Sequence, residues 1–263
     1  MILDELHFAT PIPGIRAVNT QRGTVNARNP YSQHNLCDYV GDDALRVLDA
    51  RLEFCQLMGI DLDCLVMPRQ SHTTRVAVID RKFLDADIEE QELHLNDVDA
   101  LVTALPGICI GVNTADCVPI VMADPQSGVV AVAHAGWRGT AGRIAQATVR
   151  NMQCLGAQPE RIQAAMGVSI CNDCFEVGDE VVSNFADAGH DIDAIMHRDA
   201  TGKAHIHLAR ANALVLQAAG LAPENITMPA ACSRCHSDRY FSARRLGINS
   251  GRTFTAIIKH QDL

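Results

Sequence analysis

Short apolar runs of β-type residues recur along this chain and alternate irregularly with longer segments of helical spacing. Helices are expected at about residues 42–58, 141–154, 179–188 and 208–219, where apolar residues recur every three to four positions and glycine follows closely. Because strands and helices do not alternate strictly, the pattern favours an α/β or α+β fold built on layered sheets. The first 35 residues, rich in Pro, Gly, Arg and Asn, are expected to be irregular. The expected strands lie at about residues 64–67, 75–79, 100–103, 108–113, 119–122, 129–133, 164–166, 226–231 and 253–259.

The length and composition indicate one globular unit. A chain of 263 residues, 48% of them apolar and 20% charged, can bury roughly three quarters of its unfolded surface. No Pro/Gly/Ser-rich linker and no block of like charge divides the sequence. We therefore expect a single domain over residues 1–263.

The charge balance limits the partners. A net charge of −9 and a pI near 5.6 argue against a nucleic-acid backbone as partner. Single nucleosides and other small metabolites remain compatible with it. No apolar run approaches the roughly 20 residues that span a bilayer, and the N-terminal residues 1–5 carry acids where a signal peptide is basic. These features predict a cytoplasmic protein that does not bind membranes.

Three short segments each place one metal-ligand residue beside turn residues. They contain His72, Cys117 and His134. Cys117 and His134 are 17 residues apart, and two apolar runs with an Asp-Pro turn lie between them. Such a connection can return the chain so that both strand ends project into one pocket. A His/Cys/His set is a three-ligand zinc or copper site with one open position, which is typical of a catalytic metal.

Each of these residues has other interpretations. An isolated histidine such as His72 is usually an ordinary polar residue, and its place after an apolar run and Pro68 is what favours a site. Cys117 could instead be a nucleophile activated by His134. Asp116 could orient a metal ligand or simply cap a turn or helix. The Gly-rich turn after His134 could hold an anion at the next helix start, or could be a plain strand-to-helix turn.

The chain also contains two Cys-x-x-Cys pairs. Together they suggest a four-thiolate structural zinc site, although the pairs could also be mere neighbours. The second pair continues into His236, as in a haem-attachment string, but that chemistry needs an oxidising compartment. The pairs are Cys171 with Cys174 and Cys232 with Cys235.

Several arginines are candidates for anion recognition. Arg244 and Arg245 follow the aromatic pair Tyr240-Phe241, and Arg22 and Arg28 lie in the N-terminal segment. Guanidinium groups bind phosphate in a bidentate manner and aromatic rings stack on bases. Most surface arginines have no such role.

Taken together, these motifs resemble those of the bacterial YfiH-type proteins, a family long called laccase-domain or multicopper polyphenol oxidase and now regarded as purine nucleoside phosphorylases. The resemblance extends over nearly the whole chain. Departures are Thr24, Asn26, Thr73, Val168 and Ala243, where the family usually has other residues. The matching segments are residues 70–72, 99–103, 114–119, 134–139 and 232–245.

The resemblance implies a four-layer α-β-β-α sandwich with mixed sheets. It also implies a metal site, usually zinc, with copper as the other option, at His72, Cys117 and His134, which would be the catalytic residues. The implied activities are phosphorolysis of adenosine, inosine and methylthioadenosine, and a side activity of adenosine deamination. A metal that lowers the pKa of a bound water to about 7 accounts for the deaminase branch.

Within this interpretation we expect Arg22 or Arg244 to bind phosphate and Asn35 to contact the sugar or base. The partners are then purine nucleosides and phosphate, and the protein is a monomer or a homodimer. Laccase chemistry is not expected, because four coppers need many His-x-His pairs. The chain has 11 histidines and one such pair, at residues 205–207.

Two other functions remain open from the sequence. The first is a metal-free Cys–His hydrolase with Cys117 as nucleophile, acting on an amide or ester. The second is a non-catalytic protein that binds nucleosides or metal without turnover.

Overall fold

The computed structural model describes residues 1–25 and 29–260. One of its two large sheets has five strands in the order β1-β2-β14-β6-β3. All neighbours are antiparallel except β6 and β3. The strands are β1 (Leu3–Glu5), β2 (Ile15–Thr20), β14 (Thr253–Lys259), β6 (Cys109–Thr114) and β3 (Leu65–Val66).

The second large sheet has six strands in the order β13-β9-β7-β8-β5-β4. Its two edge pairs are parallel and its central pairs are antiparallel, so it is a mixed sheet. The strands are β13 (Ile226–Thr227), β9 (Gln163–Met166), β7 (Val118–Ala123), β8 (Val130–Ala135), β5 (Ala100–Thr103) and β4 (Val76–Val78).

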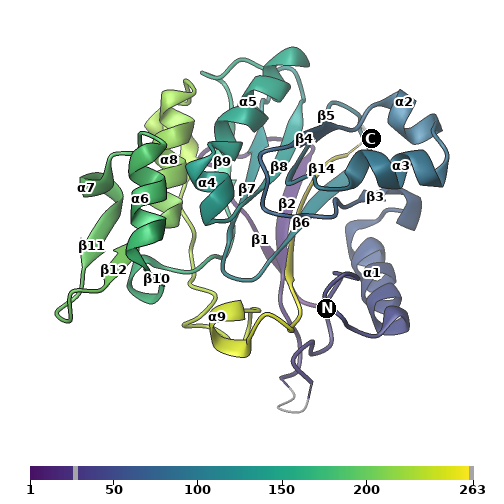
Figure 1. Cartoon of the computed structure of the whole chain (residues 1–263). Coiled ribbons are helices and arrows are strands. Elements are labelled where there is room, and N and C mark those ends of the chain that lie inside the picture. The colour runs from purple at the N-terminus through teal and green to yellow at the C-terminus, as the bar shows by residue number, and fades with distance from the viewer. Residues whose placement is uncertain (26–28, 261–263) are drawn as a thin grey trace.

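These sheets pack face to face and helices cover their outer faces (Figure 1). One apolar cluster joins residues of both sheets, such as Ile110 and Val132. Helices α5 (Ile144–Cys154) and α8 (Leu208–Ala218) pack on the outer face of the six-stranded sheet. Helix α1 (Ala44–Met58) packs on the five-stranded sheet through Phe54, whose ring meets Phe254 edge-on at 5.1 Å. The order is therefore helix, sheet, sheet, helix, which confirms the expected four-layer α/β architecture.

Smaller elements complete the chain. A three-stranded antiparallel sheet, β10-β12-β11, lies to one side beside α6, α7 and α8 (Figure 1). The elements are α2 (Arg81–Asp85), α3 (Ile88–Leu95), α4 (Trp137–Ala141), β10 (Glu176–Val177), α6 (Asp179–Asp187), α7 (Ile192–Ile195), β11 (Met196–Arg198), β12 (Ala204–Ile206), α9 (Ala243–Leu246) and the short 3-10 turns η1 (Leu62–Cys64), η2 (Asn172–Cys174) and η3 (Pro223–Asn225).

Most expected strands are confirmed, and β14 has the expected bounds, but several expectations are wrong. The N-terminal segment is not irregular throughout, because β2 pairs with β14 inside the five-stranded sheet. The expected helix at 141–154 begins only at Ile144 as α5, and the expected turn before it forms the short helix α4; Gly142 and Arg143 separate the two, and Arg143 has a φ of 63°. The strand expected at residues 226–231 is β13, which ends at Thr227.

Helix α1 has nearly the expected bounds, and of the apolar residues that recur at helical spacing only Cys55 is buried. The leucines at its helical spacing, Leu45, Leu48 and Leu52, are 41–72% exposed. The side chains that face the sheet are Val47, Ala50, Phe54, Cys55 and Met58.

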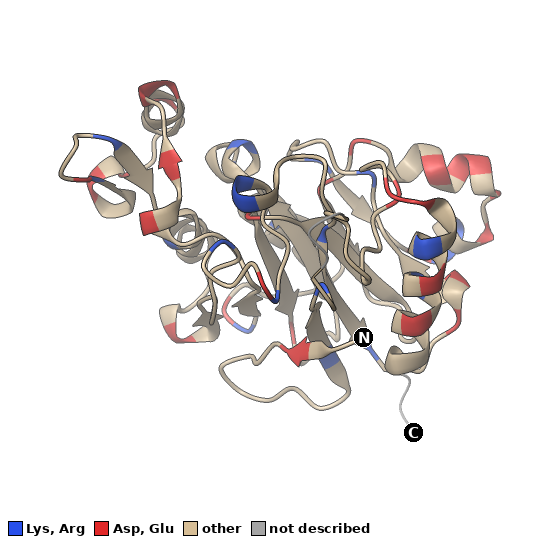
Figure 2. Ribbon diagram, turned by 90° about the horizontal axis from the view of Figure 1, so that it is seen from below, with Lys and Arg blue, Asp and Glu red and all other residues tan. Residues whose placement is uncertain are grey.

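Charged residues lie mainly in the peripheral helices and loops, and the central strands β5, β7 and β8 of the six-stranded sheet contain none (Figure 2). Among the described residues, no helix has both the length and the apolar character that crossing a membrane requires.

Candidate metal centre

A tight hairpin brings Cys117 and His134 together. Cys117 directly precedes β7, and His134 lies near the end of the antiparallel strand β8, where it pairs with Pro119. The turn between the strands forms around Asp124, whose carboxylate accepts bonds from the turn amides of Gln126 and Ser127. The expected return of the chain is confirmed, and both residues lie where the two central strands of the six-stranded sheet meet, at the start of β7 and the end of β8.

His72 reaches the same place from a different loop. It has left-handed backbone with a φ of 64°, which is uncommon for a residue with a side chain. Its Nε2 is 3.9 Å from the Cys117 Sγ, and its ring centroid is 4.8 Å from that of His134. One donor atom from each of the three residues lies within 4.8 Å of the others.

Asp99 positions both histidines. It is fully buried and precedes β5 beside β8. Its Oδ1 accepts from His134 Nδ1 at 2.7 Å and from the His72 backbone N–H at 3.1 Å, and Oδ2 accepts from the Thr73 N–H at 2.6 Å. A histidine that donates from Nδ1 to a carboxylate keeps Nε2 free for a metal. Asp99 is therefore the residue that orients the ligands.

The electrostatics of the site favour a thiolate. Burial alone would raise the pKa of Cys117, but the neighbouring His134 and His72 lower it to about 6. Burial likewise opposes a charge on His134, yet Cys117 and Asp99 raise its pKa to about 9. Burial would raise the pKa of Asp99, but His134 and Thr73 hold it at about 2. Cys117 is thus ionised near neutral pH, which is the form that binds a metal.

Gly136 provides the space that this centre needs. A Cβ at this position would lie 2.8 Å from His72 Cδ2 and 3.0 Å from Cys117 Sγ. The donor set, its spacing and this clearance all fit a zinc or copper ion held by two imidazoles and one thiolate. His134 is buried, Cys117 is half-buried and His72 is exposed, so the centre opens to solvent on the His72 side.

Asp116 does not orient a ligand. Its φ is 86°, and its carboxylate accepts from Ser233 Oγ at 2.6 Å and from the Arg244 backbone N–H at 2.7 Å in the first turn of α9. Asp116 thus bonds to the first turn of α9 from a distant loop, while Ser242 is the N-cap of that helix. The residue that bonds to both histidines is Asp99. Its position immediately before a buried strand is the signal in the sequence that could have indicated it.

The Gly-rich turn after His134 leads directly into the one-turn helix α4. Gly136 is its N-cap, and the Arg138 guanidinium lies 4.2 Å from the centre of the Trp137 ring. This is a strand-to-helix turn whose glycines allow close packing on the metal loop.

Two of the residues expected to bind substrate are buried. The guanidinium of Arg22 donates to Ser32 Oγ and to the Ser237 carbonyl and lies 5.0 Å from the Phe241 ring centre. The Asn35 amide group donates to the Cys37 carbonyl, and its oxygen accepts from the Arg252 N–H. Neither side chain forms a hydrogen bond with His72, Cys117 or His134.

Arg244 lies nearer to the centre. Its backbone is bonded to Asp116, next to Cys117, and its exposed side chain donates to the Glu176 carbonyl at 3.0 Å. Arg28 lies outside the described residues. The cysteines of the two Cys-x-x-Cys pairs form a second group of converging sulfurs.

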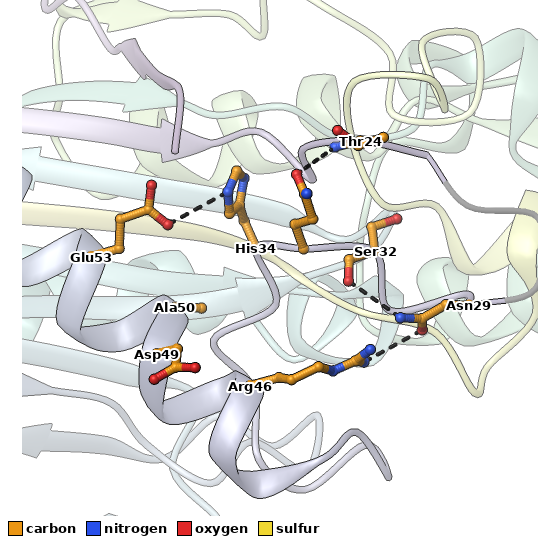
Figure 3. A pocket seen from close by; sticks show the side chains of 9 residues that line it. Thr24, Asn29, Ser32, His34, Arg46, Asp49, Ala50 and Glu53 are labelled. Carbon is orange, nitrogen blue, oxygen red and sulfur yellow. Dashed lines mark hydrogen bonds and ion pairs between the residues drawn. The ribbon is translucent and has the colours of Figure 1, made fainter.

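A pocket of about 460 Å³ lies elsewhere, between α1 and the loop at residues 29–34 (Figure 3). Glu53 and Arg46 project into it from α1, and His34 Nε2 is 3.6 Å from Glu53 Oε2. None of the three metal-site residues lines it. His205, of the His-x-His pair, is buried and bonded to Asn172, and it belongs to neither converging ligand group in the described part of the chain.

The fold and the site define a class: a four-layer α/β protein in which three candidate metal ligands converge at the ends of central strands. Residues 16–260 match the family model described as multi-copper polyphenol oxidoreductase laccase. The chain belongs to this family, and the resemblance seen in its motifs is thereby confirmed.

Similar proteins include two with named activities. Adenosine deaminase RL5, from an unknown prokaryotic organism, is 62% identical over 98% of both chains. A purine nucleoside phosphorylase of Bacteroides thetaiotaomicron is 37% identical over 93% of this chain and 91% of that protein. The crystal structure of YlmD from Geobacillus stearothermophilus superimposes with a TM-score of 0.87 at 29% identity, over 95% of this chain and 94% of that one.

Proposed function

We propose that this protein is a metal-dependent enzyme of purine nucleosides. It would cleave adenosine, inosine or methylthioadenosine with phosphate to the free base and a sugar 1-phosphate, and deaminate adenosine as a side activity. The observation that carries the proposal is the convergence of His72, Cys117 and His134 within 4.8 Å. The named activities of the two relatives support the choice of substrate class.

The residues of the centre have distinct roles in this proposal. His72, Cys117 and His134 hold zinc, or alternatively copper, which when bound supplies Lewis-acid activation at an open position. Asp99 keeps the proton on His134 Nδ1 and so directs Nε2 toward the ion. The exposed position of His72 leaves the open side of the centre accessible to a nucleoside.

For phosphate we favour Arg244, because its side chain is exposed and its backbone is tied to the loop of Cys117. Arg22 and Asn35 remain predicted contacts of the phosphate and of the sugar or base, and each would have to exchange internal hydrogen bonds for the substrate. In the described part of the chain the ten cysteines are not joined in disulfides; this fits a reducing cytoplasm, which we propose as the location.

The test is to incubate the zinc-loaded protein with adenosine, with and without phosphate. We expect a sugar 1-phosphate and adenine only when phosphate is present, and inosine in both cases. The His72→Ala variant should lose all products. Tight nucleoside binding without any product would instead indicate a binding protein.

A specific feature also favours the Cys–His hydrolase as a second candidate. Asp99, His134 and Cys117 form a line of carboxylate, imidazole and thiol, which is the arrangement of a nucleophile with its base. That arrangement gives no role to His72, whereas a metal centre does. Protein that keeps full activity after metal removal, but loses it when Cys117 is alkylated, would establish the hydrolase and refute the metal-dependent enzyme.

A further inference from the structure

A second cluster of donor atoms lies outside the centre described above. Cys171 is the N-cap of the short turn η2 after β9 and Cys174 is its last residue, and Cys232 and Cys235 lie in the turn that follows β13. The four sulfurs all lie within 4.8 Å of one another, and those of Cys174 and Cys235 are 3.5 Å apart. A tetrahedral zinc with Zn–S bonds of about 2.3 Å separates its sulfurs by about 3.8 Å. The observed spacing matches that geometry.

The two loops are held together by backbone hydrogen bonds. Ser169 and Cys232 form a parallel β-bridge, and the Ser233 N–H donates to the Ser169 carbonyl at 3.0 Å. The Cys171 N–H donates to the Cys232 Sγ at 3.3 Å. An N–H group directed at a sulfur stabilises its thiolate form. The loops therefore present the sulfurs to a common point.

The charges around the cluster also suit a metal. Four thiolates on one Zn²⁺ leave a net charge of about −2, because structural sites bind the deprotonated thiols. Arg234 lies between the two cysteines of its pair, and its Nη1 is 3.3 Å from the Cys174 Sγ. A fixed cation at this distance offsets part of that negative charge.

We propose that Cys171, Cys174, Cys232 and Cys235 hold a second metal ion, a structural zinc with all four positions filled by protein sulfur. It differs from the first centre, which has three protein ligands and an open position. The proposal does not depend on the enzymatic activity.

The second site is mechanically connected to the first. Ser233, between the cysteines of the second pair, donates from Oγ to Asp116 Oδ1 at 2.6 Å. The Ile170 N–H, just before Cys171, donates to the Asp116 carbonyl at 2.9 Å. Asp116 has left-handed backbone and precedes Cys117. A zinc ion that clamps both loops would therefore fix the backbone that presents Cys117 to the first centre.

The deciding measurement is the zinc content of protein purified from zinc-supplemented medium under reducing conditions. We expect two zinc ions per chain in the wild type and one in the His72→Ala/Cys117→Ala variant. We also expect one in Cys171→Ser/Cys235→Ser and two in the control Cys154→Ser, which changes an exposed cysteine outside the cluster. If the Cys171→Ser/Cys235→Ser variant does not fold, the His72→Ala/Cys117→Ala variant decides alone. No zinc in that variant, or unchanged zinc in the Cys171→Ser/Cys235→Ser variant, overturns the proposal.

Two further readouts identify the ligands and the connection. Cobalt(II) bound to the His72→Ala/Cys117→Ala variant should give the strong thiolate-to-cobalt absorption of a four-sulfur site. An intact mass showing that these cysteines are joined in disulfides would refute the proposed zinc site. In the Cys171→Ser/Cys235→Ser variant, amide exchange should accelerate at residues 167–170 and 232–234 but not in β14. Unchanged exchange at those loops would overturn the connection to Asp116.

Discussion

At the scale of single residues, Asp99 is the side chain on which the metal centre depends most. It is fully buried, and it accepts hydrogen bonds both from the ring of His134 and from the loop that carries His72. A carboxylate that accepts four or more hydrogen bonds holds its donors in one geometry. The positions of two ligands are thus set by one residue that binds no metal itself.

Replacing Asp99 with asparagine should weaken zinc binding at this centre by roughly 10- to 100-fold, the usual loss when a partner of a metal-bound histidine is changed. The amide carries no negative charge, and its NH₂ group faces donors instead of accepting from them. Competition with a chromophoric chelator measures the affinity. Asp97→Asn, two residues away and exposed, is the matched control and should bind zinc normally. Equal affinities in the two variants would show that Asp99 does not orient the ligands.

Gly136 supports a second prediction at this scale. In Gly136→Ala the new methyl group would overlap the His72 ring and crowd the Cys117 sulfur, so His72 has to move. Zinc affinity should fall at least roughly tenfold, as when ligand geometry is disturbed. In Gly139→Ala the nearest atoms are 3.4 Å from the added carbon, and this variant should retain zinc. Normal zinc binding by Gly136→Ala would show that the loop of His72 can shift without disturbing the ligand geometry, and would contradict this prediction.

At the scale of elements, the β7–β8 hairpin brings Cys117 and His134 together, and Asp124 stabilises its turn. The Asp124 carboxylate is completely buried and pairs with Arg161, whose Nη2 is 2.7 Å from Oδ2. Burial alone would raise the pKa of Asp124, but Arg161 and three backbone N–H donors lower it to about 2.

This depressed pKa predicts how stability depends on pH. An unfolded aspartate has a pKa near 3.9, so the pair stabilises the fold fully above about pH 4 and loses its contribution as the pH falls toward 2. Asp124→Asn should therefore lower the free energy of unfolding by about 2 kcal/mol at pH 7. The difference from wild type should shrink between about pH 4 and pH 2. Urea unfolding at several pH values measures both, with the exposed Asp187→Asn as control. A constant difference across this range would contradict the assignment.

The elements also show where a local pattern is sufficient. The strands β5 to β9 and β14 were predicted because each is a mostly apolar run that is buried on both faces. Strands β1 and β2 were missed, because β2 contains Arg16 and Asn19 and is recognisable only by its pairing with β14. In α1 the helical spacing was correct, but it does not identify the buried face, since both faces of that helix carry apolar side chains and only packing on the sheet decides between them.

At the scale of the whole molecule, the metal centre joins loops from separate parts of the chain, so a bound ion should stabilise the entire fold. Protein stripped of metal with a chelator should gain about 2.7 kcal/mol when free zinc reaches 100 times the dissociation constant. For a chain of this size that corresponds to a rise of roughly 5–10 °C in the unfolding midpoint. Differential scanning calorimetry during a zinc titration measures the rise. His72→Ala should show a smaller rise, and an unchanged midpoint in the wild type would mean that no ion links these loops.

The sequence alone indicated the fold class, most of the buried strands and the three residues of the candidate metal centre, because burial patterns and ligand types are properties of short segments. It also identified the two cysteine pairs, but not that they meet. The tertiary structure decided the role of Asp99, the bond of Asp116 to α9 and the internal hydrogen bonds of Arg22. It also decided the convergence of four sulfurs from turns about 60 residues apart. Each of these depends on which loops the packed sheets bring side by side, and no local pattern of residues encodes that juxtaposition.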